Sequence, residues 1–289
     1  MSGAATGLSI LRFAPSPTGF LHLGHVRSAL VNRDCAARLG GHVLLRIEDI
    51  DPTRSRAEPV AAIEEDLAWL GFKWPEPVRL QSLHMRDYRA AAQRLLDMEL
   101  LYPCFATRAD IEAAADPALR DPDGAPLYPG MWRGRMALDV EAHRNTGAPF
   151  AMRLDMAGAL ERIGGRSLTF REWDGGERVD VIEARPERWG DLVLVRKEVP
   201  TSYHLSVVVD DALQGVTHVV RGRDLYAATD VHRLLQTLLD LPEPIYHHHA
   251  LLLDASGRKL SKSAGDTSIR SLRAAGVMPE QVLRMADRV

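Results

Sequence analysis

Alternating strand-like and helical patterns at the start of the chain restrict its fold more than any other feature. Residues 9–13 form a short apolar run, and residues 22–39 carry apolar side chains at helical spacing. A second β-rich run follows at residues 42–47, and a second helical pattern spans residues 58–70. This β-α-β-α order predicts an α/β fold whose parallel strands are joined by right-handed crossovers.

In a parallel sheet of this kind, ligands bind beyond the carboxyl ends of the strands. Two loops are expected there, at residues 15–19 and 48–52. His22, Gly24 and His25 begin the helix after the first loop, and the two histidines, three residues apart, share a helix face. Because the N–H groups of a helix N-terminus favour anions, this segment predicts a phosphate site. Two ordinary, partly buried histidines are the alternative.

The sequence suggests four consecutive parts. The α/β pattern occupies residues 8–103, and residues 104–200 then change to short strands rich in Pro, Gly and Asp, which predicts an inserted subdomain. Alternating strands and helices resume at residues 201–244. Residues 245–289 begin with a strand-like run and end in two short helical stretches. We therefore expect one nucleotide-binding domain interrupted by an insertion.

Composition limits the class of protein further. The chain has 289 residues, of which 46% are hydrophobic, enough for a large core. Its net charge of -3 excludes nucleic-acid binding through bulk positive charge and leaves room for a local basic face. Two cysteines give no disulfide framework, no run approaches the length of a membrane helix, and residues 1–8 lack the basic start that is typical of a signal peptide. We expect a cytoplasmic protein without membrane contact.

A lysine-serine segment at residues 259–263 would bring mobile positive charge to the same phosphates. Together with the segment from Pro15 to His25, it resembles the HIGH and KMSKS signatures of class I aminoacyl-tRNA synthetases. Residues 12–19, Arg-Phe-Ala-Pro-Ser-Pro-Thr-Gly, resemble the glutamyl branch of that family. The resemblance implies a Rossmann-type nucleotide-binding fold with an inserted subdomain and a short helical C-terminal region.

A class I synthetase forms an aminoacyl adenylate when a carboxylate attacks the α-phosphorus of ATP and pyrophosphate leaves. The protein mainly positions the reactants and stabilises charge on phosphate oxygens. The resemblance implies that His22, His25 and Lys262 are catalytic and that Mg²⁺ arrives with the nucleotide. The residues implied in ATP binding are His22, Gly24, His25, Lys259, Leu260, Ser261, Lys262 and Ser263.

An amino acid with a second carboxylate calls for arginine, whose planar fork accepts a carboxylate and discriminates against an amide. The resemblance implies that Glu48 takes the ammonium group and that Tyr203 and Arg221 hold carboxylate oxygens. Which arginine takes the side-chain carboxylate stays open, and surface ion pairs are the ordinary alternative. The residues implied in glutamate binding are Arg12, Phe13, Ala14, Pro15, Ser16, Glu48, Tyr203 and Arg221.

Other acidic and histidine-rich segments are weak metal candidates. Asp210 and Asp211, or residues 49–51, could bind a metal, although magnesium usually needs few protein ligands when it arrives on a nucleotide. Consecutive histidines at residues 247–249 point to alternate faces of a strand and cannot easily converge. We expect them to lie near the nucleotide or simply to end a strand.

The closest resemblance is to glutamyl-queuosine tRNA(Asp) synthetases, paralogues of glutamyl-tRNA synthetase without its anticodon-binding domain. We expect the same truncation here, since the chain ends soon after Ser263. Many members of that family bind zinc in the insertion. The matching positions here are Cys104, Ala106, Tyr128 and Trp132, and neither alanine nor tryptophan can ligate, so we expect aromatic packing and no zinc.

The resemblance implies that glutamate is activated with ATP in the absence of tRNA and then transferred to queuosine in the anticodon of tRNA(Asp). The expected partners are L-glutamate, ATP and the anticodon stem-loop of tRNA(Asp), and we expect a monomer. The catalytic body of an ordinary glutamyl-tRNA synthetase is the main alternative. A glutaminyl synthetase, a non-catalytic RNA-binding paralogue and a distant nucleotidyltransferase fit the motifs less well.

Overall fold

The computed structural model of the protein describes residues 7–51, 57–253 and 267–287. Its strands are β1 (Ile10–Phe13), β2 (His42–Ile47), β3 (Arg79–Leu80), β4 (Leu101–Cys104), β5 (Ala151–Leu154), β6 (Thr169–Trp173), β7 (Val179–Glu183), β8 (Val193–Val195), β9 (His218–Gly222) and β10 (Ile245–His249). Its α-helices are α1 (Leu23–Arg38), α2 (Ala57–Trp69), α3 (Met85–Asp97), α4 (Arg108–Ala114), α5 (Ala137–Asn145), α6 (Met156–Arg162), α7 (Tyr203–Leu213), α8 (Ala228–Leu238), α9 (Ile269–Ala274) and α10 (Pro279–Ala286). Short 3-10 helices are η1 (Gln81–His84), η2 (Pro186–Trp189) and η3 (Arg223–Leu225).

The N-terminal half forms the predicted parallel unit. Strand β2 lies between β1 and β3 and pairs in parallel with both, and α1 connects β1 to β2. Gly40 follows the helix with a φ of +62°, a conformation that glycine adopts without strain. A Cβ atom on Gly41 would lie 2.0 Å from the carbonyl oxygen of Ser9, so only glycine lets the chain return this close to β1. The strand and helix predictions for this region are confirmed.

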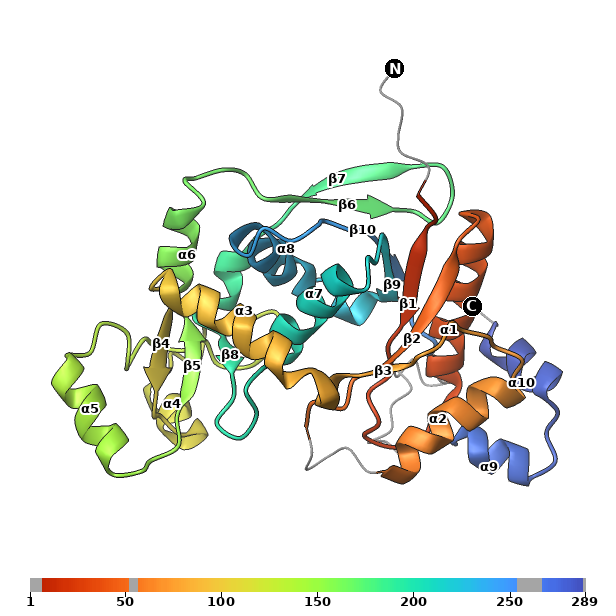
Figure 1. Cartoon of the computed structure of the whole chain (residues 1–289), viewed down its shortest axis with the longest axis horizontal. Coiled ribbons are helices and arrows are strands. Elements are labelled where there is room, and N and C mark those ends of the chain that lie inside the picture. The colour runs from red at the N-terminus through yellow and green to blue at the C-terminus, as the bar shows by residue number, and fades with distance from the viewer. Residues whose placement is uncertain (1–6, 52–56, 254–266, 288–289) are drawn as a thin grey trace, which may run out of the picture.

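The second sheet continues the α/β pattern. Its strand order is β7-β6-β10-β9, in which β10 pairs in parallel with both β9 and β6. The backbone N–H of Thr217, just before β9, donates to the carbonyl oxygen of Ile10 over 2.9 Å, so β9 begins beside β1 (Figure 1). Parallel strands from both halves of the chain therefore meet at the centre of the molecule, as the expected Rossmann-type fold requires.

One hairpin lies elsewhere than the sequence suggested. Strands β6 and β7 fall within residues 104–200, the expected insertion, yet β6 pairs with β10 and extends the central parallel sheet. Strand β10 in turn comes from residues 245–289, which we expected to form a separate C-terminal region. These pairings join segments about 70 residues apart, and no local pattern in the sequence reports them.

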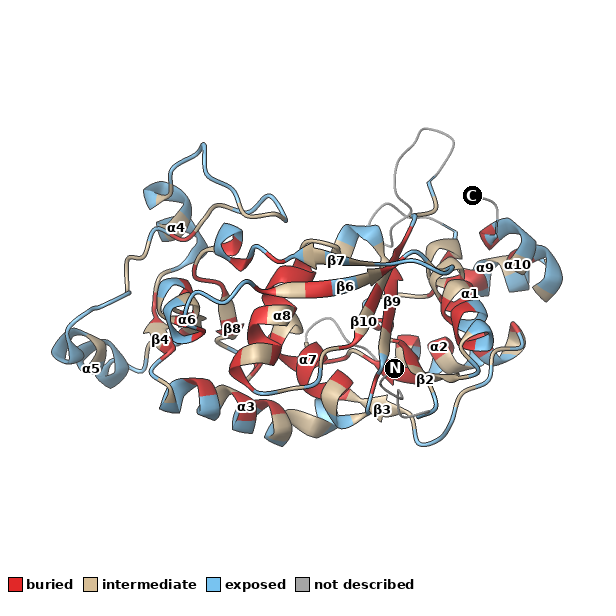
Figure 2. Cartoon of the chain, turned by 90° about the horizontal axis from the view of Figure 1, so that it is seen from above, coloured by how far each residue is buried: buried red, intermediate tan, exposed pale blue. Residues whose placement is uncertain are grey.

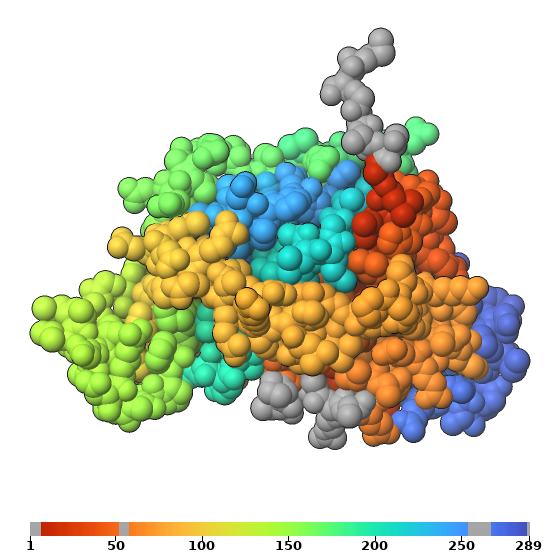
Figure 3. All heavy atoms as spheres, in the orientation of Figure 1, coloured from red at the N-terminus to blue at the C-terminus, as the bar shows by residue number. Residues whose placement is uncertain are grey.

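The other strands of the insertion, β5 and β8, form a small antiparallel sheet with β4, which ends where the insertion begins, in the order β4-β5-β8. With α4 and α5 it forms one end of the molecule, opposite the end made by α1, α2 and the C-terminal helices (Figures 1 and 3). Helices α4 and α5 contain no buried residues and are exposed along most of their length (Figure 2). These two helices therefore present much surface and contribute no buried residue to the core.

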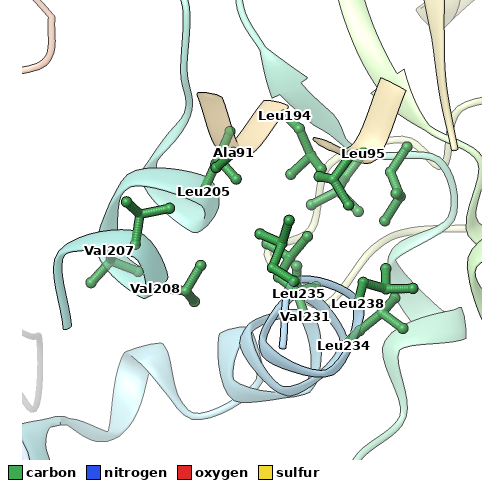
Figure 4. Packing of buried hydrophobic residues seen from close by; sticks show 14 of the residues in the cluster. Ala91, Leu95, Leu194, Leu205, Val207, Val208, Val231, Leu234, Leu235 and Leu238 are labelled. Carbon is green, nitrogen blue, oxygen red and sulfur yellow. The ribbon is translucent and has the colours of Figure 1, made fainter. Parts of the chain in front are cut away.

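Of three hydrophobic clusters among the described residues, the two largest hold these parts together. In the larger one, Leu205 of α7, Leu235 of α8 and Leu95 of α3 pack with Leu194 of β8, so the insertion shares a core with the central domain (Figure 4). The smaller one joins α1 and α2 to the C-terminal helices α9 and α10. Among the described residues, no helix has both the length and the apolar character needed to cross a membrane.

Candidate active site

A cleft of about 670 Å³ opens where the carboxyl ends of β1, β2 and β9 meet the start of α1. It takes its walls from segments that are far apart in the sequence. The described residues that we expected to contact glutamate or ATP all line it: Arg12, Phe13, Ala14, Pro15, Ser16, His22, Gly24, His25, Glu48, Tyr203 and Arg221. The fold therefore brings the candidate residues of four separate motifs to one place.

The start of α1 is capped by its own histidines. Nδ1 of His22 accepts a hydrogen bond from the backbone N–H of Gly24, and Nδ1 of His25 accepts one from the backbone N–H of His22, both over 3.1 Å. The two ring centroids lie 3.9 Å apart. Because both Nδ1 atoms are acceptors, each neutral ring carries its proton on Nε2, the tautomer that can donate to a phosphate oxygen.

The segment 259–263, including the candidate catalytic Lys262, lies outside the described residues. The described chain on either side of it borders the cleft. Leu251 and Leu252 line the cleft directly. Beyond the gap, the backbone N–H of Ile269 donates to the carbonyl oxygen of Leu21 over 2.8 Å, next to the start of α1.

Arg12 is fixed from behind by a buried carboxylate. Its Nε donates to Oδ1 of Asp211 over 3.1 Å, and Nη2 of the fully buried Arg46 donates to the same oxygen over 2.8 Å. Burial alone would raise the pKa of Asp211, but the two guanidinium groups outweigh it and hold this pKa below its usual value. Asp211 is therefore charged and orients Arg12 toward the cleft.

The side chain of Glu48 is almost completely buried. Its side chain is 10% exposed, and an oxygen lies 3.7 Å from Nη2 of Arg46. Burial raises the pKa of Glu48 to about 7, although Arg46 and Arg12 lower it in part. A cationic group bound in the cleft would stabilise its charged form.

Asp210, beside Asp211 at the end of α7, has a structural role. Its fully buried carboxylate accepts hydrogen bonds from Arg79 and Gln81 over 2.7 Å each, and from the hydroxyl of Tyr88 over 2.9 Å. These contacts fasten β3 and α3 to α7. Among the described residues, no group of three or more His, Cys, Asp or Glu side chains is placed to hold a metal ion.

Arg221 lies across the cleft in a different environment. It is 4% exposed, and its nitrogens donate to Nε2 of His248 over 3.1 Å, Nδ1 of His232 over 3.2 Å, the hydroxyl of Tyr203 over 3.3 Å and Oγ1 of Thr229 over 2.7 Å. None of these partners is acidic. Within the described residues Arg221 has no carboxylate partner, and it is thus a buried cation beside a cleft.

The histidines around Arg221 are neutral at physiological pH. Burial, and then the nearby guanidinium of Arg221, lower the pKa of His204 to about 4 and that of His232 well below its usual value. Burial also lowers the pKa of His248 to about 4, although Glu172 acts in the opposite direction. The positive charge on this side of the cleft therefore belongs to Arg221.

The three consecutive histidines of β10 have three different environments. Nδ1 of His247 lies 2.8 Å from the carbonyl oxygen of Trp173 in the β6–β7 hairpin. His248 contacts Arg221. His249 lines the cleft and ends the strand, and its buried Nε2 has no hydrogen-bond partner within the described part of the chain. His249 is a cleft residue that the sequence could suggest only as lying near the nucleotide.

The four positions at which the resemblance implied a degenerate zinc site, without zinc, include a hydrogen-bonded aromatic cluster. The hydroxyl of Tyr128 accepts from the thiol of Cys104 over 3.4 Å and from the backbone N–H of Trp132 over 2.8 Å. The rings of Trp132 and Phe105 lie 4.9 Å apart. Ala106 and Trp132 offer no ligand atom, so these residues do not fit a four-coordinate zinc.

Sequence reasoning missed several residues around this site. Arg46, two residues before Glu48, was given no role, and Glu172, Thr229 and His232 carry no motif. Each acts through a side-chain contact that the sequence does not show. Asp211 drew attention only as an acidic neighbour of Asp210. The signal that could have found it is the requirement that buried arginines have an acidic partner.

The parallel sheet, the histidine-capped helix and the arginine-lined cleft suit an enzyme that binds a nucleotide and an anionic substrate at the carboxyl ends of its strands. Residues 10–289 match the family model "tRNA synthetases class I (E and Q), catalytic domain". The chain belongs to this family of ATP-using ligases.

Two bacterial relatives illustrate this membership. The chain is 43% identical to a glutamyl-Q tRNA(Asp) synthetase of Rhodobacter capsulatus, over 96% of this chain and 99% of that protein. It is 38% identical to a glutamate–tRNA ligase of Aquifex aeolicus, over 93% of this chain and 54% of that protein. The chain thus spans about half the length of that ligase and nearly all of the first relative.

A solved structure shows the same fold. The glutamate-tRNA synthetase of Elizabethkingia anophelis superimposes with a TM-score of 0.69 at 27% identity, over 90% of this chain and 53% of that chain. The expected α/β fold class is therefore confirmed.

Proposed function

We propose that this enzyme activates L-glutamate with ATP to glutamyl adenylate and then transfers glutamate to the queuosine base in the anticodon of tRNA(Asp). One observation carries the first half of this proposal. Arg221, a buried cation with no acidic partner in the part of the chain that the structure describes, faces the same cleft as the carboxylate of Glu48. A ligand with an ammonium group and two carboxylates complements this distribution of charge.

In this proposal the ammonium group of glutamate pairs with Glu48, and its carboxylates contact Arg12 and Arg221. Hydrogen bonding of Nε to Asp211 leaves the two Nη atoms of Arg12 available to the ligand. Glutamine would place a neutral amide where the second carboxylate belongs. Arg221 would then stay buried without a counter-charge, which costs several kcal/mol.

The nucleotide would occupy the part of the cleft at the start of α1. Nε2–H of His22 and of His25, together with the helix N-terminus, would donate to phosphate oxygens. Lys262 would place an ammonium group on the phosphate in the transition state, and Mg²⁺ would arrive bound to ATP, where it neutralises phosphate charge.

The acceptor is proposed from the relatives. Two relatives of similar length, from Rhodobacter capsulatus and Symbiobacterium thermophilum, are glutamyl-Q tRNA(Asp) synthetases, and the chain covers 99% and 83% of them. We propose the anticodon stem-loop of tRNA(Asp) as the RNA partner, a monomeric enzyme, and the cytoplasm, where its tRNA would be found. Transfer to the terminal adenosine is the second candidate, since glutamate–tRNA ligases match at 38% identity.

The activation half is tested by ATP–pyrophosphate exchange without tRNA. Glutamate should support exchange, and glutamine and aspartate should support it poorly. The proposal predicts this because the described groups that would contact glutamate all lie in one cleft of this chain. Exchange that appears only after tRNA is added would contradict it.

A further inference from the structure

Strand β6 places an acid directly behind the arginine site. Oε2 of Glu172 lies 2.8 Å from Nδ1 of His248, and Oε1 accepts the backbone N–H of His248 over 2.9 Å. Nε2 of the same ring accepts from Nε of Arg221 over 3.1 Å. Glu172 does not line the cleft, so its influence on the cleft passes through the imidazole.

The donors around His248 fix its tautomer. Arg221 can only donate, so Nε2 must be unprotonated and the ring proton must lie on Nδ1, where it donates to Glu172. The hydrogen bonds of Thr229 are consistent with this tautomer of His248. Its hydroxyl oxygen accepts from Nη2 of Arg221 over 2.7 Å, which leaves its proton to face Nε2 of His248 over 3.3 Å.

We propose that Glu172 is a positioning residue for the amino-acid site, which acts by holding His248 in the Nδ1-protonated form that accepts a hydrogen bond from Arg221. The inference rests on the proposed role of Arg221 in binding glutamate. The arrangement lets a carboxylate orient the guanidinium without neutralising it, because a neutral ring stands between the two charges. Arg221 thus keeps its charge for a ligand.

The burial of these groups strengthens the effect. The side chain of His248 is 1% exposed and that of Glu172 is 19% exposed, so little water is present to replace a lost hydrogen bond. The pKa of His248, lowered to about 4 first by burial, keeps the ring neutral across the working range of pH. The contrast with Arg12 is clear, since Asp211 touches that guanidinium directly.

Glu172→Gln is the informative variant because it keeps the size of the side chain. Its single oxygen can serve the backbone N–H or the ring N–H of His248, and the other donor then meets an NH₂ group. The ring can relieve this conflict by moving its proton to Nε2, where it would face the donors of Arg221 and Thr229. The variant therefore disrupts the hydrogen bond between Arg221 and His248, although residue 172 forms no hydrogen bond with Arg221.

The test measures exchange kinetics of the full chain. In Glu172→Gln the KM for glutamate should rise about 10- to 100-fold, the scale of one hydrogen bond to a charged group, while the KM for ATP stays within about twofold. Glu183→Gln is the matched control on the same hairpin, because its side chain is 64% exposed, and it should behave as the unaltered enzyme. An unchanged KM for glutamate in Glu172→Gln would overturn the inference.

A double-mutant cycle that combines Glu172→Gln with His248→Leu tests whether Glu172 acts through His248. Glu172→Gln should raise the KM for glutamate no further when His248 is already absent. An equal further rise would show that Glu172 acts by another path and would overturn the inference. Thermal unfolding identifies any variant that loses its fold.

Nitrogen-resolved NMR of the imidazoles provides a readout on the single variant. The ring of His248 should be protonated on Nδ1 in the unaltered enzyme and on Nε2 in Glu172→Gln. The same tautomer in both proteins would also overturn the inference. Arg221→Lys separates the two proposals, because a normal KM for glutamate in that variant would refute the glutamate site itself.

Discussion

At the scale of single residues, the site works through three charged groups whose surroundings differ. Arg12 is paired with Asp211, Arg221 is surrounded by neutral partners, and Glu48 is buried close to its point of titration. The sequence named these three cleft residues through their motifs. It could not show the difference between the two arginines, because the partners of each are set by the fold, and Asp211 lies 199 residues from Arg12 in the chain.

The pH dependence of glutamate binding tests Glu48. With a pKa raised to about 7, the carboxyl loses its charge as the pH falls below 7, and the ammonium group of the substrate loses its partner. We expect the KM for glutamate to rise about 10-fold per pH unit below 7. Exchange kinetics between pH 5.5 and 8.5 measure it, and Glu48→Gln should abolish this dependence. A flat profile in the unaltered enzyme would remove Glu48 from the site.

His22 has two roles that one substitution can separate. Asparagine is a good N-cap residue, so His22→Asn should keep the free energy of unfolding within about 1 kcal/mol. It lacks the Nε2–H that would face the phosphates, so exchange should fall roughly 100-fold. Urea unfolding and exchange measure the two effects. Normal exchange in a stable variant would show that the ring only caps the helix.

At the scale of elements, α7 links the amino-acid site to the rest of the fold. Tyr203 begins the helix and lines the cleft, while Asp210 and Asp211 near its end hold arginines from other segments. The helix was predicted as part of the alternating strands and helices of residues 201–244. Its connections were not, since they depend on which strands lie beside it.

Removal of the Asp211 carboxylate should strongly lower the free energy of unfolding. Asp211→Ala leaves Arg12 and the fully buried Arg46 without their shared partner, and breaking a buried pair costs about 3–5 kcal/mol. Urea unfolding should show a loss of this size. Glu141→Ala on the exposed helix α5 is the control and should stay within about 0.5 kcal/mol. A small loss in Asp211→Ala would mean that water solvates the two arginines.

At the scale of the whole molecule, the sequence predicted strands and helices that follow from a local pattern, but it did not predict which distant strands pair. Strands β1 and β2, with α1 between them, follow from hydrophobic period and glycine stops. The pairing of β6 with β10 brings Glu172 to His248, 76 residues further along the chain, and no periodicity encodes such a contact. The range expected to be one insertion therefore contributes to two sheets.

The insertion also allows a metal test. Cys104 donates a hydrogen bond to the hydroxyl of Tyr128, and the ring of Trp132 packs on that of Phe105. We expect that elemental analysis finds less than about 0.1 zinc per chain and that EDTA changes neither the unfolding midpoint nor exchange. One tightly bound zinc per chain would require ligands other than these four positions.

The position of the transferred glutamate on the tRNA shows whether queuosine or the terminal adenosine is the acceptor. Labelled glutamate is transferred by the full chain to tRNA from cells with and without queuosine, and the digested tRNA shows which nucleotide carries the label. If queuosine is the acceptor, we expect label on the queuosine nucleotide of tRNA(Asp) and none in tRNA that lacks queuosine. Label on the 3′-terminal adenosine, or equal labelling of both preparations, would contradict it.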